Sequence, residues 1–147
     1  MTKDILVRIS GLHQEPDGET AETDEVIEVI VPGIYYYKNK KQYILYEEIG
    51  ENGETTKNQV KIYEDKHIEV RKSGALTATL VFETGCKHGT AYQTPFGLMQ
   101  MTTDTRAIEL EEAEDIIGIG IDYSLEVNRE PVADCRIEIS ITPRQGQ

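Results

Sequence analysis

Apolar and polar residues alternate along almost the whole chain, and this alternation constrains the fold more than any other feature. The clearest run places an apolar side chain at every second position from Ile117 to Val127, with glycine or polar residues between them. A period of two residues is typical of a β-strand that buries one face. The composition agrees, because 17 Ile, 14 Thr and 9 Val outnumber 8 Leu and 7 Ala, and β-branched residues favour strands. The pattern therefore predicts an all-β protein.

Turn signals divide the chain into nine or ten expected strands. Examples are Pro16-Asp17-Gly18 and Asn52-Gly53, both common in tight turns. We also expect a bend or bulge at Pro32-Gly33, inside a long strand. The expected strands cover residues 4–10, 25–37, 42–48, 55–63, 67–72, 75–83, 90–94, 97–110, 117–127 and 135–141.

The short turns imply antiparallel pairing of consecutive strands, and so an up-and-down meander. A meander of this many twisted strands removes its exposed edges by closing on itself. We therefore expect an antiparallel barrel of about 8–10 strands, with a two-sheet sandwich as the alternative. The length of 147 residues predicts one domain spanning 1–147.

A series of short motifs gives this meander a family resemblance. In chain order they are Gly33-Ile34-Tyr35-Tyr36, Tyr43-Ile44-Leu45-Tyr46-Glu47-Glu48, Lys72-Ser73-Gly74-Ala75, the segment 82–85, Pro95-Phe96-Gly97-Leu98 leading into Thr102-Thr103, and Ile121-Asp122-Tyr123. Their order resembles the YwiB-like family of small bacterial proteins, a domain of unknown function with a calycin-type, lipocalin-like β-barrel. The chain departs from the family pattern at Lys72, where we expect arginine. Lysine keeps the charge there but lacks the planar guanidinium fork.

The resemblance implies a fold and a cavity but no activity, and a barrel of about eight strands has room for one small ligand or for side chains alone. Inward-facing tyrosines offer an apolar ring and a hydroxyl to a ligand, or else they fill the barrel. If one carboxylate and one cation at the strand ends point inward, they could pair inside the cavity. Otherwise Glu47, Glu48, Arg71 and Lys72 face water. The candidate ligand-binding residues are Tyr35, Tyr37, Tyr46, Glu48, Lys72, Phe82, Tyr92, Phe96 and Tyr123.

Motifs for metal binding and catalysis are missing. The histidines His13, His67 and His88 lie in different segments, and only Cys86 and His88 lie together, too few ligands for a zinc site. The sequence has no Gly-x-Ser-x-Gly motif, and Gly118-Ile119-Gly120 lies inside an expected strand rather than before a helix. We therefore expect no metal and no cofactor and assign no catalytic residue, which leaves an unrecognised enzyme as the least favoured function class.

The charge balance excludes some partners. With 15 basic and 27 acidic residues the formal net charge is −12, which disfavours nucleic acid and anionic membrane surfaces. The N-terminal residues carry charges where a signal peptide needs an apolar core, and the two cysteines do not require a disulfide. We expect a cytoplasmic protein, either a monomer or a weak homodimer. The favoured function is binding of a small apolar ligand. The alternative is a solid scaffold that presents an exposed apolar patch, for example across 35–37, to a protein partner.

Overall fold

One antiparallel sheet of ten strands makes up the computed structural model, which describes residues 2–14, 27–50, 53–74, 77–94, 97–113 and 116–144. The part of the chain that the structure describes contains no helix, and so none that could cross a membrane. The strands are β1 (Thr2–Gln14), β2 (Ile27–Lys38), β3 (Lys41–Ile49), β4 (Thr55–Ile62), β5 (Ile68–Gly74), β6 (Ala78–Phe82), β7 (Lys87–Thr94), β8 (Gly97–Glu112), β9 (Ile117–Val127) and β10 (Glu130–Pro143).

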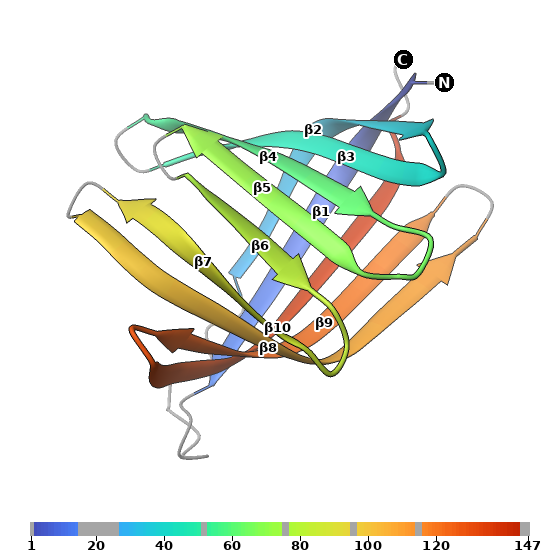
Figure 1. Cartoon of the computed structure of the whole chain (residues 1–147). Coiled ribbons are helices and arrows are strands. Elements are labelled where there is room, and N and C mark those ends of the chain that lie inside the picture. Colours follow the sequence, from blue (N-terminus) through green and yellow to red (C-terminus); the bar gives the residue numbers. More distant parts are fainter. Residues whose placement is uncertain are drawn as a thin grey trace.

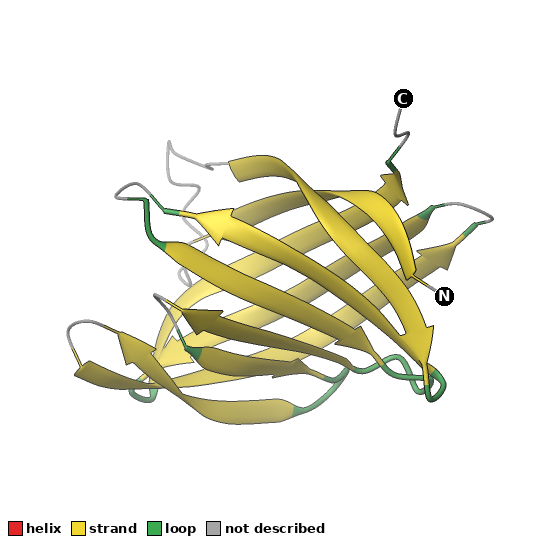
Figure 2. Cartoon of the chain, turned by 90° about the horizontal axis from the view of Figure 1, so that it is seen from above, coloured by secondary structure: helices red, strands yellow, loops and turns green. Residues whose placement is uncertain are grey.

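The strands follow one another around a nearly closed barrel (Figure 1), in the order β6-β5-β4-β3-β2-β1-β10-β9-β8-β7. Neighbours in this order are consecutive in the chain except where β1 pairs with β10, for example at Val7 and Ile141. That ladder joins the N-terminal half of the sheet to the C-terminal half. The strands cross the barrel obliquely (Figure 2), as closure of a twisted sheet requires. The prediction of an up-and-down antiparallel barrel is confirmed.

Several strand boundaries differ from the sequence pattern, and β1 continues to Gln14 instead of ending at residue 10. β7 begins at Lys87, because the turn expected at 85–89 lies at 83–86. β8 runs without interruption to Glu112, and a register shift between Thr105 and Ala107 lets the strand pass around the barrel. β10 already begins at Glu130, with an irregularity after Pro131.

The core lies inside the barrel and takes alternate residues from the strands. Val7, Ile44, Val60 and Ile68 are completely buried. Aromatic rings fill part of the interior as well, and Phe82 meets Tyr123 edge to face with ring centroids 4.9 Å apart, a favourable geometry for aromatic pairs. Thr56, Asn58, Thr103 and Thr105 interrupt this apolar interior, and Asn58 belongs to the candidate site.

Candidate functional site in the barrel wall

Strands β2 and β3 separate at Pro32, which splits the barrel wall. β2 pairs with β3 only from Gly33 to Lys38, whereas it pairs with β1 from Ile27 to Tyr36. Proline has no N–H to donate to a ladder, and Gly33 allows a close approach, since a Cβ there would lie 2.7 Å from the Leu45 carbonyl oxygen. Pro32-Gly33, where a bend or bulge was expected, thus marks the place where β2 and β3 part, while the register of β2 on β1 runs through both residues without a bulge.

A cavity of about 930 Å³ occupies this split, and we call it the wall cavity. Residues on the inner face of the barrel line one side of it, and residues on the outer face line the other. The inner-face residues include Val29, Val31, Tyr46, Glu48 and Asn58, and the outer-face residues include Ile34, Leu45, Glu47, Ile49, Lys57 and Arg71. The wall cavity therefore connects the surface with the interior. Apolar atoms contribute most of its lining surface, and charged side chains stand among them.

A small polar cluster lies at the inner end of the wall cavity. The Lys72 ammonium donates to Asn58 Oδ1 at 2.7 Å and to Glu48 Oε1 at 3.3 Å. Tyr46, Asn58 and Lys72 stand opposite one another on β3, β4 and β5. Asn58 is only 2% exposed, and its Nδ2 donates weakly to the Thr56 carbonyl oxygen at 3.4 Å. Polar groups at interior positions need such partners, because burial without them is costly.

The charges in this cluster balance one another. Lys72 and Glu48 form an ion pair whose side chains are 21% and 43% exposed, respectively. Solvent reaches the carboxylate, so the pair contributes about 1 kcal/mol or less to stability. Burial raises the pKa of Tyr46, and the nearby Glu48 carboxylate raises it further. The phenol therefore remains a neutral side chain with a hydroxyl proton to donate.

The structure brings only some of the sequence-predicted residues to this site. Tyr46 and Glu48 line the wall cavity, and Lys72 lies behind them, so the carboxylate and the cation do meet inside the barrel. Phe82 and Tyr123 belong to the core cluster. Phe96 and the side chain of Tyr92 lie outside the described residues.

The other two candidates, Tyr35 and Tyr37, lie near the opposite mouth of the barrel. The Tyr35 hydroxyl donates to Gln42 Oε1 at 2.9 Å, and Gln42 Nε2 donates to Glu112 Oε1 at 2.9 Å. Burial raises the pKa of Tyr35, with smaller contributions from Glu112 and Tyr37. Tyr37 is 54% exposed. Cavities of about 190 and 590 Å³ share Gln42 and Glu112, so this hydrogen-bonded chain separates two shallow openings.

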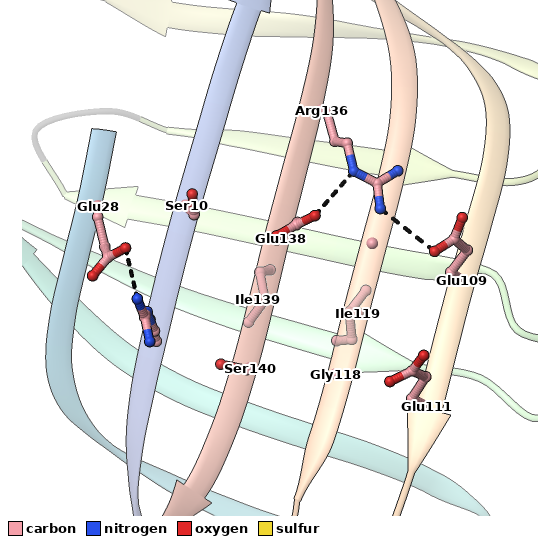
Figure 3. Close-up of a pocket in the computed structure, with 12 residues that line it drawn as sticks. Ser10, Glu28, Glu109, Glu111, Gly118, Ile119, Arg136, Glu138, Ile139 and Ser140 are labelled. Atoms are coloured by element: carbon pink, nitrogen blue, oxygen red, sulfur yellow. Dashed lines mark hydrogen bonds and ion pairs between the residues drawn. The ribbon is translucent and has the colours of Figure 1, made fainter. Parts of the chain in front are cut away.

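A further groove of about 370 Å³ crosses the outer face of β1, β10, β9 and β8 (Figure 3). Arg136 bonds Asp122 at 2.7 Å and Glu138 at 3.1 Å, and it reaches Glu109 at 3.4 Å. Its guanidinium covers Gly120, where a Cβ would lie 2.9 Å from Nη2. The glycine of the sequence motif thus makes room for an arginine whose charge is already neutralised, and we interpret this groove as structural.

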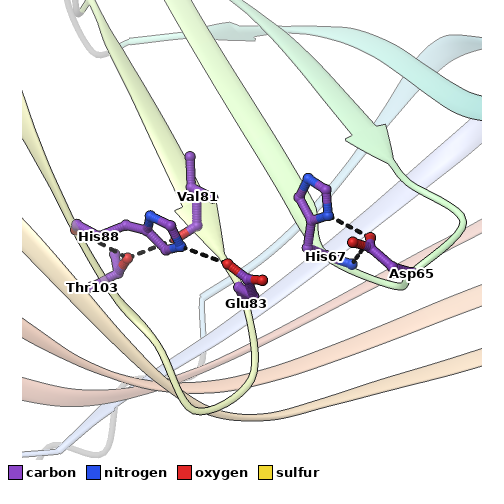
Figure 4. Close-up of polar contacts among 6 residues, drawn as sticks. All are labelled: Asp65, His67, Val81, Glu83, His88 and Thr103. Carbon is purple, nitrogen blue, oxygen red and sulfur yellow. Dashed lines mark hydrogen bonds and ion pairs between the residues drawn. The ribbon is translucent and has the colours of Figure 1, made fainter.

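The seam where the barrel closes carries a second set of polar contacts (Figure 4). Thr103 Oγ1 donates to the Val81 carbonyl oxygen at 2.8 Å and lies 3.5 Å from that of His88. His88 Nε2 lies 3.0 Å from Glu83 Oε1 at the same seam. Away from the seam, His67 contacts Asp65 in the turn between β4 and β5. Among the described residues no three His, Cys, Asp or Glu side chains are arranged to hold a metal ion.

Sequence reasoning did not identify Thr56 and Asn58. A signal was present, since the two residues occupy the buried face of a strand that continues with Val60 and Ile62. An amide at such a position indicates a buried polar contact. Its partner, Lys72, could not be identified without the register of β4 against β5.

The comparisons with known proteins agree with this architecture. The model of a "Domain of unknown function (DUF1934)" matches residues 7–139. The chain belongs to this family. It is 33% identical over 119 residues to the "Uncharacterized beta-barrel protein YwiB" of Bacillus subtilis (strain 168), covering 81% of this chain and 82% of that protein. The crystal structure of the ywiB protein from Bacillus subtilis matches with a TM-score of 0.84 and 26% identity over 98% of this chain and 94% of the other. The resemblance inferred from the motifs is confirmed.

Proposed function

We propose that the protein binds a small, largely apolar ligand in the wall cavity. The observation that supports this proposal is the split between β2 and β3, which leads from the surface to the polar cluster of Glu48, Asn58 and Lys72. The volume of the wall cavity, about 930 Å³, falls within the range of small-molecule sites. Such sites are mainly apolar, with a few polar groups that orient the ligand.

Exposed apolar side chains around the split favour the same conclusion. Val29, Ile34 and Ile49 are 39%, 40% and 78% exposed, and all three line the wall cavity. Apolar side chains gathered at one opening mark a contact site more often than isolated ones do. They would gain burial from an apolar ligand of about the width of the split.

A protein partner is the second candidate. Leu6 and Ile30, which are 37% and 58% exposed, extend the apolar surface beyond the lining of the wall cavity along β1 and β2. In this case the apolar patch would centre on these strands rather than on residues 35–37, of which Tyr35 and Tyr36 are only partly exposed.

We also propose that the protein acts in the cytoplasm as a monomer or weak homodimer, without nucleic acid. The formal net charge of −12 supports the exclusion of nucleic acid. Cys86 and Cys135 form no disulfide, and Cys135 is buried, which suits a reducing compartment.

A neutral apolar fluorophore, N-phenyl-1-naphthylamine, tests the proposal with a matched pair of variants. Val29→Trp places a large ring in the wall cavity, whereas Val132→Trp changes a valine of similar exposure (44%) on β10, outside its lining. We expect the native protein to enhance the fluorescence, Val29→Trp to abolish the enhancement and Val132→Trp to leave it unchanged. No enhancement by the native protein, or equal loss in both variants, would overturn the proposal.

A further inference from the structure

We infer that the wall cavity selects a ligand whose head group is neutral and donates a hydrogen bond, such as a hydroxyl or a carboxamide. This inference rests on the proposed function and adds the chemistry of the part of the ligand that reaches the barrel interior. Three features carry it: an acceptor at the inner end of the wall cavity, a cation behind that acceptor, and a buried amide that holds the cation in place.

The acceptor is the carboxylate of Glu48. Its Oε1 atom pairs with Lys72, and no described residue donates a hydrogen bond to Oε2. The side chain lines the wall cavity and is 43% exposed. A ligand that enters between β2 and β3 would displace water from this oxygen, so it must supply a donor to avoid an unsatisfied buried carboxylate.

The cation sets the charge that the ligand meets. Lys72 is not part of the lining; it lies on β5, behind Asn58, which stands opposite it on β4. The bond of 2.7 Å to the almost fully buried Asn58 fixes the ammonium close to Glu48. The inner end of the wall cavity therefore carries one negative and one positive charge, and its net charge is zero.

A neutral head group suits this arrangement better than an ion does. A carboxylate would approach the like charge of Glu48, and an ammonium would lose its hydration to meet a carboxylate already paired with Lys72. The charged residues at the outer rim, which include Glu47, Lys57 and Arg71, are of both signs and exposed. Solvent screens them, so they discriminate little between head groups.

Four compounds with the same octyl chain test the inference, namely 1-octanol, octanamide, octanoate and octylammonium. Their dissociation constants are measured at pH 7 by displacement of N-phenyl-1-naphthylamine. We expect octanamide and 1-octanol to bind about tenfold more tightly than either ion. Equal or tighter binding of an ion, or failure of every octyl compound to displace a bound fluorophore, would overturn the inference and leave the cavity proposal standing. Absence of fluorophore binding would overturn the proposed function itself.

Charge variants make the origin of the preference testable. Lys72→Met leaves the negative charge of Glu48 without its opposite charge. We expect the affinity for octylammonium to rise about tenfold relative to the affinity for octanamide. Glu48→Gln leaves the positive charge of Lys72 without its opposite charge, and the affinity for octanoate should rise by a similar factor relative to octanamide. Lys72→Arg keeps the charge, and the double variant Glu48→Gln/Lys72→Met removes both charges, so each should retain the preference for neutral compounds.

Urea unfolding of every variant shows which of them are folded. Because the single variants are expected to shift the preference in opposite directions, a general loss of packing cannot imitate the result. A preference for neutral compounds that persists unchanged in Lys72→Met and in Glu48→Gln would show that other residues select the head group, and would overturn the inference.

Discussion

The Thr103 hydroxyl on β8 donates a hydrogen bond of 2.8 Å to the backbone carbonyl of Val81 on β6. These strands lie near opposite ends of the sheet order, β6 first and β8 ninth, and among the residues that the structure describes no ladder pairs β6 with β7 or β8. A side chain thus performs at the seam what backbone hydrogen bonds perform elsewhere in the barrel. Loop contacts add to it, since Gly85 N–H donates to the Thr105 carbonyl at 2.8 Å.

We expect Thr103→Val to lower the free energy of unfolding by about 1–3 kcal/mol, because the Val81 carbonyl loses its donor in a buried setting. Thr103 is 1% exposed, so water does not easily replace the hydroxyl. Urea denaturation measures the change, and amide exchange should show faster opening of β6. Unchanged stability with unchanged exchange in β6 would show that the seam does not depend on this bond.

Thr105 provides the matched comparison. It lies two residues further along β8 with the same exposure of 1%, yet its Oγ1 is buried with no hydrogen-bond partner among the described residues. Valine has nearly the same shape, so Thr105→Val removes an unsatisfied polar group and should raise the free energy of unfolding by about 1 kcal/mol. A loss of stability comparable to that of Thr103→Val would contradict this account of the seam.

The approach of β2 to its neighbours depends on Gly33. A Cβ at this position would lie 2.7 Å from the Leu45 carbonyl oxygen and 2.8 Å from Val7 Cγ2. We expect Gly33→Ala to cost about 1–3 kcal/mol of unfolding free energy, since a rigid backbone atom and a buried side chain must both move. Gly11→Ala is the control, because nothing lies within 4 Å of a Cβ there. Similar costs for the two variants would contradict the prediction.

Two tyrosines should make the protein sensitive to alkaline pH. Burial raises the pKa of both Tyr46 and Tyr123 above the ordinary value near 10. In the unfolded chain these phenols release their protons at about pH 10, while in the folded protein they keep them. The unfolded state therefore binds fewer protons, and stability, fully present below about pH 10, declines as the pH rises further.

Spectrophotometric titration at 295 nm checks this behaviour, because tyrosinate absorbs there. We expect Tyr46 and Tyr123, two of the eight tyrosines, to ionise only as the barrel unfolds. Tyr46→Phe and Tyr123→Phe should each reduce the slope of unfolding free energy against pH in this range. Early, reversible ionisation of all eight in the folded protein would contradict the burial of these rings.

The fold was predictable because its signals are local. The stripe from Ile117 to Val127 identifies the buried face of β9, and the tight turns require antiparallel neighbours. The ends of the strands were harder to predict than their presence. β7 begins at Lys87, although Gly85 and Gly89 had suggested a turn over residues 85–89. His88 and Gly89 pair with β8 instead, and this pairing overrides the local preference for a turn.

The candidate site was predictable only in part. Glu48 and Lys72 were identified as charges at strand ends that could meet inside the barrel. Their contact depends on the register of β3 on β4 and of β4 on β5, which places the two side chains near Asn58. A shift of one residue in either ladder would turn an interior side chain to the surface.

The sequence by itself determined that this chain forms antiparallel strands and which face of most strands is buried, because residue alternation and turn chemistry act over a few neighbouring positions. Tertiary structure decided that the meander closes into a barrel rather than a sandwich, where the barrel wall splits, how Thr103 closes the seam and which charges at the strand ends meet. Those features depend on pairing between residues far apart in the chain and on the space left between their side chains. No single segment of the sequence determines either of them.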